Sequence, residues 1–513
     1  MRTRFIACIL LITLCVGLLA GCKEEKSDSS VFSIGFGITD VTPTQSLPLA
    51  GYNGSSAAEF RWSTATEWPF QAVCVAITDP SGNTIMLVTL DLINATMAEG
   101  MRDAITNTTG VPKTNIMFHC THNHSGPSLG TDAPEVTSYI SQLTAGVLAA
   151  AEAAMADRAP ITGMQTTYAR PEGYNTERHY LLADGTYQSY GVGSVPKDQL
   201  IGHYGVADNL LQLVRFQRDS AKDVVMVNWQ GHPPGTDPNT IATSNFPGVL
   251  RNYLDKNLDC QSIFFLGGSG NLNNNSQIKG EIVHENYQQL GENLGATAVE
   301  AAKNFTDRSI DTIQVTEKML QLENLNYGAT KVWVYAITIG DFALVTAPFE
   351  IFDDNAVAVR ENSPYVMTMY LSCCNGSNGY LPTPPSFSWQ ITYEATITKF
   401  PQGTAEIVEG ELIGMLKGMA EETQYKGPQK AEDYYQAEFI PKTNGVVYMN
   451  SAPGEMTYTA VKNDFYAFQL LDKNSAKVKN FLCKDEELVK RILSTSEVKL
   501  VFDVQGVVVD IAE

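Results

Sequence analysis

The chain has 513 residues, with 35 Lys and Arg against 56 Asp and Glu, and its formal net charge is −21 at pH 7. So acidic a chain excludes nucleic acid as an expected partner, and it also excludes broad electrostatic attachment to an anionic membrane surface. The length suffices for one large domain with a smaller companion, because cores rarely grow past about 250 to 300 residues before a chain splits.

The first 30 residues have the pattern of a bacterial lipoprotein export signal. Two arginines precede an apolar run over residues 5–20, and small residues stand directly before Cys22. The run is shorter than the roughly 20 apolar residues that a membrane-spanning helix needs. We therefore expect residues 1–21 to be cleaved as a signal peptide, Cys22 to carry a lipid, and residues 22–30 to form a polar tether. The protein would then be exported and lipid-anchored to a bacterial membrane, on its periplasmic or cell-surface side.

Past the tether, predicted strands and helices alternate. Apolar runs rich in β-branched residues predict strands, and amphipathic or alanine-rich runs predict helices. The first two strands are expected to form a hairpin across residues 79–82. This alternation predicts an α/β sandwich with a mixed sheet over residues 31–425. We expect strands at 73–77, 85–92, 115–118, 161–168, 223–230, 262–266, 332–339 and 342–346, and helices at 97–106, 134–156, 247–256, 281–304, 352–361 and 405–420.

The segment from residue 429 to residue 513 changes character. Short runs of alternating polarity predict strands, among them 445–449 and 498–502, and residues 485–493 predict one helix. We interpret this segment as a small β-rich C-terminal domain without a chemical site. Completion of the main sheet by these strands is an equally open alternative.

Six cysteines remain once the signal peptide and Cys22 are set aside. Export permits disulfides, but their pairing cannot be deduced from the sequence. The adjacent Cys373 and Cys374 are not expected to bond to each other, because such a bond is strained. The six are Cys74, Cys120, Cys260, Cys373, Cys374 and Cys483.

The strongest chemical signal is Thr121-His122-Asn123-His124-Ser125-Gly126-Pro127, which follows the strand predicted at 115–118. Three of the chain's 7 histidines lie at this strand end. Residues two apart in an extended segment share a face, so His122 and His124 are expected to point the same way and to be able to bind one metal ion. The alternative is a pair of hydrogen-bonded core histidines.

Two further segments bring potential ligands to strand ends. His232 follows the strand predicted at 223–230 and precedes two prolines, which cannot continue strand pairing. Glu350 follows the strand at 342–346 and a proline turn. A catalytic zinc needs about three protein ligands and an open position for water, and these residues together with His122 would supply them. Glu350 is alternatively a charge at a helix N-terminus.

These landmarks, taken in order, resemble the neutral/alkaline ceramidase family. The ordered set is more specific than any one motif, and it spans most of residues 33–400. The C-terminal segment is similar to the family only as a small β domain. The similar stretches are Gly35 to Pro43 with Gly51-Tyr52, Thr121 to Pro127, Asn228 to Pro233, Pro348-Phe349-Glu350, and Asn378 to Thr383 with Tyr393-Glu394.

The resemblance implies an α/β catalytic domain that hydrolyses the N-acyl linkage of ceramide or a similar substrate with zinc. Bound zinc lowers the pKa of a water to about 7 and polarises a carbonyl. The departing amine needs a proton, which an imidazole can give, and the oxyanion needs a donor. The family pattern implies His122, His232, Glu350 and Tyr380 as zinc ligands, His124 as the acid/base and Tyr393 as the donor to the substrate oxygen.

Two further residues have predicted supporting roles. Asp91, at the end of the strand at 85–92, is placed to orient a histidine from behind the metal, although a turn residue is an equal alternative. Arg178 lies near a family pattern of asparagine and arginines and is predicted to bind substrate, although the order of residues differs here.

The chain departs from the ceramidase pattern at two places. Asn273 stands in the catalytic segment where the family carries a serine, and an amide is no nucleophile. Asn245 stands where relatives usually carry aspartate. Either zinc-bound water attacks directly, or the substrate differs from ceramide, or both.

We therefore expect an exported, lipid-anchored zinc hydrolase of an N-acylated or lipid-like small molecule. One alternative is a deacylase of an N-acylated sugar or cell-wall amine, which a polar cleft would favour. Another is a non-catalytic lipoprotein that binds lipid or glycan with the same fold. A serine mechanism through Ser269 is a more distant alternative.

Overall fold

The computed structural model describes most of the chain beyond the first 30 residues. The described residues are 31–51, 60–183, 187–189, 192–203, 205, 207–236, 238–388, 392–427, 442–450, 458–461, 465–473, 478–502 and 507–512. The predicted signal peptide (1–21), the lipid attachment at Cys22 and the tether (22–30) lie outside them, so export and anchoring stay predictions. Within the described part, no helix is both long and apolar enough to cross a membrane.

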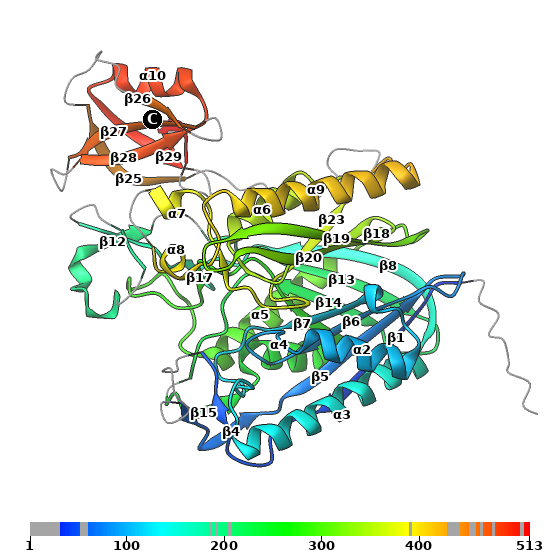
Figure 1. Ribbon diagram of the computed structural model, residues 1–513. Helices are drawn as coiled ribbons and strands as arrows, with labels where there is room; N and C mark the ends of the chain where they lie inside the picture. The colour runs from blue at the N-terminus through cyan, green and yellow to red at the C-terminus, as the bar shows by residue number, and fades with distance from the viewer. Residues whose placement is uncertain are drawn as a thin grey trace, which may run out of the picture.

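The main body is built on a nine-stranded mixed sheet (Figure 1). Its order is β16-β14-β13-β8-β1-β5-β6-β7, and β18 pairs with β8 beside this path. The pairs β14/β16 and β6/β7 are parallel and the other pairs are antiparallel. The strands are β1 Ser33–Asp40, β5 Gln71–Thr78, β6 Thr84–Leu90, β7 Ile116–Cys120, β8 Ala159–Ala169, β13 Leu211–Arg218, β14 Val224–Trp229, β16 Gln261–Leu266 and β18 Thr306–Arg308.

A second sheet stacks on the first. Its order is β19-β20-β21-β23, with β21 and β23 parallel. The core between the sheets is apolar from both sides: Val75 and Phe265 of the first sheet pack in one cluster with Ile337 and Leu344 of the second. The strands are β19 Ile313–Asn324, β20 Gly328–Ile339, β21 Phe342–Thr346 and β23 Met367–Leu371.

Helices cover both outer faces, which gives four layers (Figure 1). The long helix α3 packs closely on β1, because Gly37 has no side chain: a Cβ there would lie 1.9 Å from the carbonyl oxygen of Ala150. On the first sheet lie α2 Ala98–Thr109, α3 Pro134–Ala156, α4 Asn245–Asn257 and α5 Tyr287–Ala301, and on the second lie α6 Asp353–Glu361 and α9 Thr404–Thr423.

Short elements line the ends of the strands, where the loops meet. Four small two-stranded sheets and one of three strands occur among the described residues. They comprise β2 Pro48–Leu49, β3 Arg61–Trp62, β4 Ala65–Trp68, β9 Thr176–Glu177, β10 Tyr180–Leu182, β11 Tyr187–Gln188, β12 Leu200–His203, β15 Ile241–Thr243, β17 Leu272–Asn273, β22 Glu350–Ile351 and β24 Tyr380–Leu381. Two short helices, α7 Pro385–Ser388 and α8 Tyr393–Ile397, follow.

The C-terminal strands form a sheet of their own, in the order β25-β29-β30-β28-β27-β26. Helix α10 packs on this sheet through an apolar cluster that includes Val489 and Leu500. In the described residues these strands pair with one another and not with the main sheet, and the predicted domain start at residue 429 lies outside those residues. The elements are β25 Lys442–Met449, β26 Tyr458–Val461, β27 Phe465–Asp472, β28 Val478–Cys483, α10 Glu486–Ser494, β29 Glu497–Phe502 and β30 Val508–Ala512.

The predicted mixed α/β class is confirmed. The helix at 134–156 and the strand at 342–346 agree from end to end, and the hairpin closes as expected when Gly82 donates to the carbonyl of Asp79, 2.9 Å away. Helix α5 begins at Tyr287, later than predicted, because the Asn286 side chain caps it by accepting from the Gln289 amide at 2.9 Å. Strands β1, β13, β19 and β23 were not predicted.

All six cysteines that follow Cys22 are buried, and none of them takes part in a disulfide. The disulfides that export would permit are therefore absent among the described residues. Cys373 and Cys374 are not joined to each other, as expected for neighbours. The core itself holds the sheets together, without covalent links.

One buried ion pair joins Asp91, directly after β6, to Arg251 in α4. Both carboxylate oxygens of Asp91 accept from Arg251, at 3.0 and 2.8 Å, and the exposed fractions of the two side chains are 0% and 2%. Asp91 also accepts from the Gln71 amide at 3.2 Å. Breaking such a pair leaves an uncompensated buried charge, which is costly.

We predict that Asp91→Asn lowers the free energy of unfolding by about 3 to 5 kcal/mol, because the Arg251 guanidinium stays buried without its counter-charge. The double variant Asp91→Leu with Arg251→Met should lose less than the single variant, since it removes both charges. Chemical denaturation of the three proteins measures the difference. Equal stability of wild type and Asp91→Asn would contradict the role given to this pair.

Candidate metal centre and active site

Three buried imidazoles meet where the strands of the main sheet end. His122 and His124 follow β7, and His232 follows β14. One ring nitrogen from each residue lies within 4.8 Å of those of the other two. The ring centroids are separated by 4.5 Å between His122 and His232 and by 4.7 Å between His124 and His232. Segments more than 100 residues apart in the chain therefore build one group.

The rings of His122 and His124 converge, although not for the predicted reason. Strand β7 ends at Cys120, and His122 has a φ of 60°, so the two histidines do not lie in an extended segment. A turn brings them together instead. The Asn123 side chain fixes that turn by accepting from the Ser125 amide at 2.9 Å and donating to the Thr243 carbonyl at 2.6 Å.

Main-chain carbonyls orient two of the rings. Nδ1 of His122 lies 2.6 Å from the carbonyl oxygen of Ile93, and Nδ1 of His232 lies 3.3 Å from that of Ser269. A ring that donates from Nδ1 presents the lone pair of Nε2, which is the arrangement of many metal-bound histidines. The structure thus corrects the role of Asp91: its carboxylate pairs with Arg251, and Ile93 orients the histidine.

The three rings face one another through Nε2. Nε2 of His232 lies 2.7 Å from Nε2 of His124. Two lone pairs repel at that distance, so a proton or a cation must lie between these nitrogens. Burial lowers the pKa of His124 and of His232 well below the ordinary value, and neighbouring positive charges lower both further. Neutral imidazoles are the form that binds metal.

Glu350 and Tyr380 come to the same place on a short pair of strands. β22 and β24 run parallel with Glu350 opposite Tyr380, and Oε2 of Glu350 lies 3.1 Å from Nε2 of His122. Burial opposes charge on both members of this pair, yet Glu350 raises the pKa of His122 well above normal, and His122 lowers that of Glu350. The Tyr380 side chain also hydrogen-bonds the Glu350 carboxylate.

Tyr393, Asn273 and Ser269, which the sequence analysis considered for catalysis, have different surroundings. Tyr393 is 37% exposed on α8, with its ring centroid 6.0 Å from that of Tyr380. Asn273 bridges to the backbone of His232, and the next residue, Asn274, donates from its amide to the His232 carbonyl at 2.8 Å. Ser269, 2% exposed, contributes the carbonyl that orients His232.

Arg178 is held in a buried network that the sequence analysis missed. Its Nε donates to Oε1 of Glu394 at 2.7 Å, and its guanidinium lies 5.3 Å from the centroid of the Tyr380 ring. The other oxygen of Glu394 lies 2.8 Å from Nε2 of His179, whose Nδ1 lies 2.5 Å from Glu177. The signal was Glu177-Arg178-His179, three charged or titratable residues in a row, together with Glu394 beside Tyr393.

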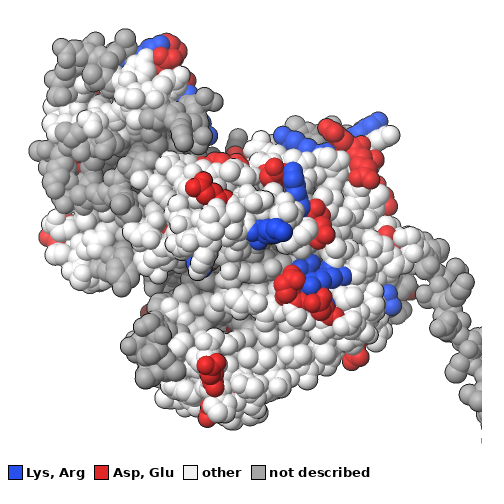
Figure 2. Space-filling model, viewed as in Figure 1, with Lys and Arg blue, Asp and Glu red and all other residues white. Residues whose placement is uncertain are grey.

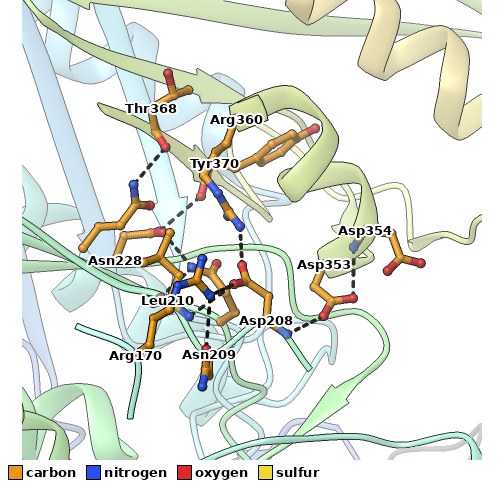
Figure 3. Close-up of polar contacts among 12 residues, drawn as sticks. Arg170, Asp208, Asn209, Leu210, Asn228, Asp353, Asp354, Arg360, Thr368 and Tyr370 are labelled. Carbon is orange, nitrogen blue, oxygen red and sulfur yellow. Dashed lines mark hydrogen bonds and ion pairs between the residues drawn. The ribbon is translucent and has the colours of Figure 1, made fainter. Parts of the chain in front are cut away.

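A second buried network supports the loop that carries Asn273. Asp353, at the start of α6, accepts from the Asn271 side chain at 2.7 Å. It also accepts from the Asp208 amide at 2.8 Å, and Arg360 pairs with Asp208 at 2.5 Å (Figure 3). Burial raises the pKa of Asp353 to about 7. These contacts tie the loop to α6 just beyond Glu350, so the loop and the carboxylate keep a fixed spacing.

His119, in β7, is a core histidine. His119 accepts from the Leu266 amide at 3.1 Å, and its other nitrogen lies 2.8 Å from the Thr89 hydroxyl. Burial lowers its pKa to about 3. Both nitrogens are occupied, so His119 joins the carboxyl ends of β7 and β16 and does not belong to the group of three.

The residues present fit a zinc ion. Imidazole is a preferred ligand, and a carboxylate lies directly beside the group. Two sets of ligands come into question, and both include His122 and His232. His124 completes the set of three imidazoles, whereas the predicted set adds Glu350 and Tyr380. The structure brings all five residues to one place, and it puts His124 inside the group that the prediction had it adjoin.

The fold and site define a mixed α/β protein with a buried three-histidine group. Two solved structures share the fold. One, described as a ceramidase complexed with C2, has a TM-score of 0.62 at 13% identity, covering 88% of this chain and 98% of its own. The neutral ceramidase from Pseudomonas aeruginosa has a TM-score of 0.61 at 14% identity, with the same coverage. The chain therefore has the fold of neutral ceramidases, as its motifs predicted. No protein-family profile and no curated protein matches it.

The buried His179 predicts a loss of stability at high pH. Burial opposes its charge, but Glu177 and Glu394 outweigh that and raise its pKa to about 10. The unfolded chain loses this proton near pH 6.5. The contribution to stability is thus complete below about pH 6.5 and is lost as the pH rises through about 10.

We expect the free energy of unfolding of the wild type to fall between pH 7 and pH 9 by about 2 kcal/mol more than that of His179→Gln, which lacks the group. Denaturant titrations at both pH values measure this difference. His203→Gln, at the partly buried His203–Glu281 pair of 2.7 Å, is the matched control. Parallel pH dependence in the wild type and His179→Gln would refute the assignment.

Proposed function

We propose that this protein hydrolyses an N-acyl amide linkage with a zinc ion. The observation that carries the proposal is the buried group of His122, His124 and His232, with Glu350 3.1 Å from His122. Three imidazoles and an adjacent carboxylate form a donor set suited to catalytic zinc. The fold of the chain supports an amide substrate, because the two solved structures described above, which share it, are described as ceramidases.

The side chains around the group have separate tasks in such a reaction. When bound, zinc supplies a water of lowered pKa, about 7, and an electrophile for the acyl carbonyl. Glu350 holds a negative charge beside the group and would either help to hold the ion or take up a proton during hydrolysis. Tyr393, whose ring is partly exposed, can donate a hydrogen bond to the substrate oxygen. Arg178, whose guanidinium lies over the Tyr380 ring, can bind substrate. Asn273 supplies no nucleophile, so we propose attack by water.

Substitution of the ligands tests the metal. We expect His122→Ala to abolish stoichiometric zinc and to lower kcat/KM by more than about 100-fold, since even residues behind metal ligands cost 10- to 100-fold. Metal analysis of purified protein, with hydrolysis assayed with and without chelator, measures both. His119→Asn is the control, because it lies on the same strand outside the group.

The same assay separates the two ligand sets. Loss of zinc in His124→Ala but not in Glu350→Gln would assign three imidazoles, and the reverse would assign His124 to acid/base work. A non-catalytic binding protein with this fold would show no turnover, and its ligand binding would survive His122→Ala. That pair of results would remove the hydrolase proposal.

A polar cavity favours a second candidate, a deacylase of an N-acylated sugar or cell-wall amine. The cavity, about 690 Å³, lies between the segment after His232 and the start of α5. Asn274, His284 and Tyr287 are among its lining residues. Tyr287 donates to the Glu67 carboxylate at 2.5 Å. Such a lining offers hydrogen bonds to hydroxyl groups, whereas the acyl and sphingoid chains of ceramide need apolar surface.

A panel of substrates decides between a lipid and a polar amine. If the cavity binds the polar part, an N-acetylated amino sugar should be hydrolysed with a kcat/KM at least about tenfold above that of short-chain ceramide, a difference of about 1.4 kcal/mol. Tyr287→Phe should then raise the KM for the amino sugar and leave that for ceramide unchanged. Preference for ceramide, unaffected by Tyr287→Phe, would favour the lipid substrate.

A further inference from the structure

Glu394 is a fully buried carboxylate that pairs with two positively charged side chains, those of Arg178 and His179. Its exposed fraction is 0%. Oε1 accepts from Nε of Arg178 at 2.7 Å and pairs with Nη2 at 2.5 Å, while Oε2 lies 2.8 Å from Nε2 of His179. Both oxygens are therefore engaged. These contacts, with the positive charges of Arg178 and His179, outweigh burial and hold the pKa of Glu394 far below its usual range.

His179 is enclosed between two carboxylates. Its Nδ1 lies 2.5 Å from Oε1 of Glu177, and the other oxygen of Glu177 accepts the His179 backbone amide at 2.9 Å. A neutral imidazole has only one N–H, so it would turn a lone pair toward one carboxylate oxygen. The geometry therefore requires an imidazolium. Glu177, His179, Glu394 and Arg178 then carry two negative and two positive charges, which cancel.

The network ends at the metal centre. The Arg178 guanidinium hydrogen-bonds the Tyr380 side chain and lies over its ring. Tyr380 in turn hydrogen-bonds Glu350, whose carboxylate touches His122. Contacts thus run without a break from β9, which holds Glu177, through α8 to β24 and β22. His179 lies near the end of the network farthest from the three-histidine group, between Glu177 and Glu394.

Stability alone is a poor reason for such an arrangement. Four charged groups taken out of water repay their desolvation only with good geometry, and apolar side chains of similar volume often stabilise a protein equally well. What the network provides is a fixed direction for the Arg178 guanidinium. The planar guanidinium can donate to Glu394 from one edge and to Tyr380 from the other only while the Glu394 carboxylate keeps its position.

We propose that His179 is a positioning residue. Glu177 fixes the His179 ring, and the ring in turn fixes the Glu394 carboxylate. Glu394 then sets the position of Arg178, and through it that of Tyr380 beside Glu350. This inference rests on the proposed hydrolase function. A loosened Arg178 lets the Tyr380 phenol and the Glu350 carboxylate leave their productive orientation, and misplacement by about 1 Å can cost 10²-fold in rate. The proposal assigns His179 no contact with substrate.

Kinetics of matched variants test the role. We expect His179→Gln, which keeps one donor and loses the charge, to lower kcat about 10- to 100-fold with little change in KM. Glu177→Gln keeps the imidazole and should lower kcat less, and it replaces His179→Gln should that variant fail to fold. His203→Gln, the same exchange at a histidine–glutamate pair outside the network, should keep the kcat of the wild type.

Zinc affinity gives a readout that needs no turnover. Because Glu350 and Tyr380 would be displaced, His179→Gln should bind zinc about tenfold more weakly in competition with a chelator, and His203→Gln should bind it as the wild type does. A merely structural role would lower only the melting temperature. Wild-type kcat and zinc affinity in folded His179→Gln, or in its replacement Glu177→Gln, would overturn the proposal. A wild type without turnover would instead count against the hydrolase, and zinc affinity would still decide the positioning.

Discussion

The site depends on main-chain hydrogen bonds that join the ends of the two stacked sheets. The amide of Asn375, just after β23 of the second sheet, donates to the Phe118 carbonyl in β7 at 2.8 Å, and the Ser372 amide donates to the Leu266 carbonyl in β16 at 3.0 Å. These bonds bring the carboxyl ends of strands from both sheets to one place. The histidines there follow strands of the first sheet, and Glu350 follows β21 of the second.

Charge is managed differently inside and outside the protein. On the face shown in Figure 2, Lys and Arg side chains are interspersed with Asp and Glu. Inside, the charged groups around the site are joined in pairs and networks, from Asp91 with Arg251 to Glu394 with Arg178 and His179. The charges within these networks balance locally, so the net charge of −21 comes from other residues of the chain.

The sequence predicted the site better than it predicted the supports behind the site. His122, His124, His232 and Glu350 were found because strand ends followed by proline or glycine are easily recognised. Ile93 and Ser269 could not be found, because they act through carbonyl groups that every residue has. Asp91 was given a histidine as partner and proved to bind Arg251, because sequence position does not reveal which buried cation lies nearby. The burial of Glu177 and Glu394 could not be predicted, since burial of a carboxylate depends on tertiary partners.

Strand β1 was missed for a related reason. In β1, glycines interrupt the apolar pattern, and they are there because α3 packs on the backbone, a contact that only the tertiary structure creates.

The orientation of His122 and His232 by carbonyl oxygens has a consequence for the evolution of such proteins. An exchange of side chain at residue 93 or 269 leaves the acceptor in place, provided that the backbone keeps its path. Substitutions can therefore accumulate at these two positions while the imidazole rings keep their orientation. In this chain, which is 13 to 14% identical to two ceramidase structures of the same fold, the carbonyls of Ile93 and Ser269 can therefore orient the imidazoles whatever side chains those two residues carry.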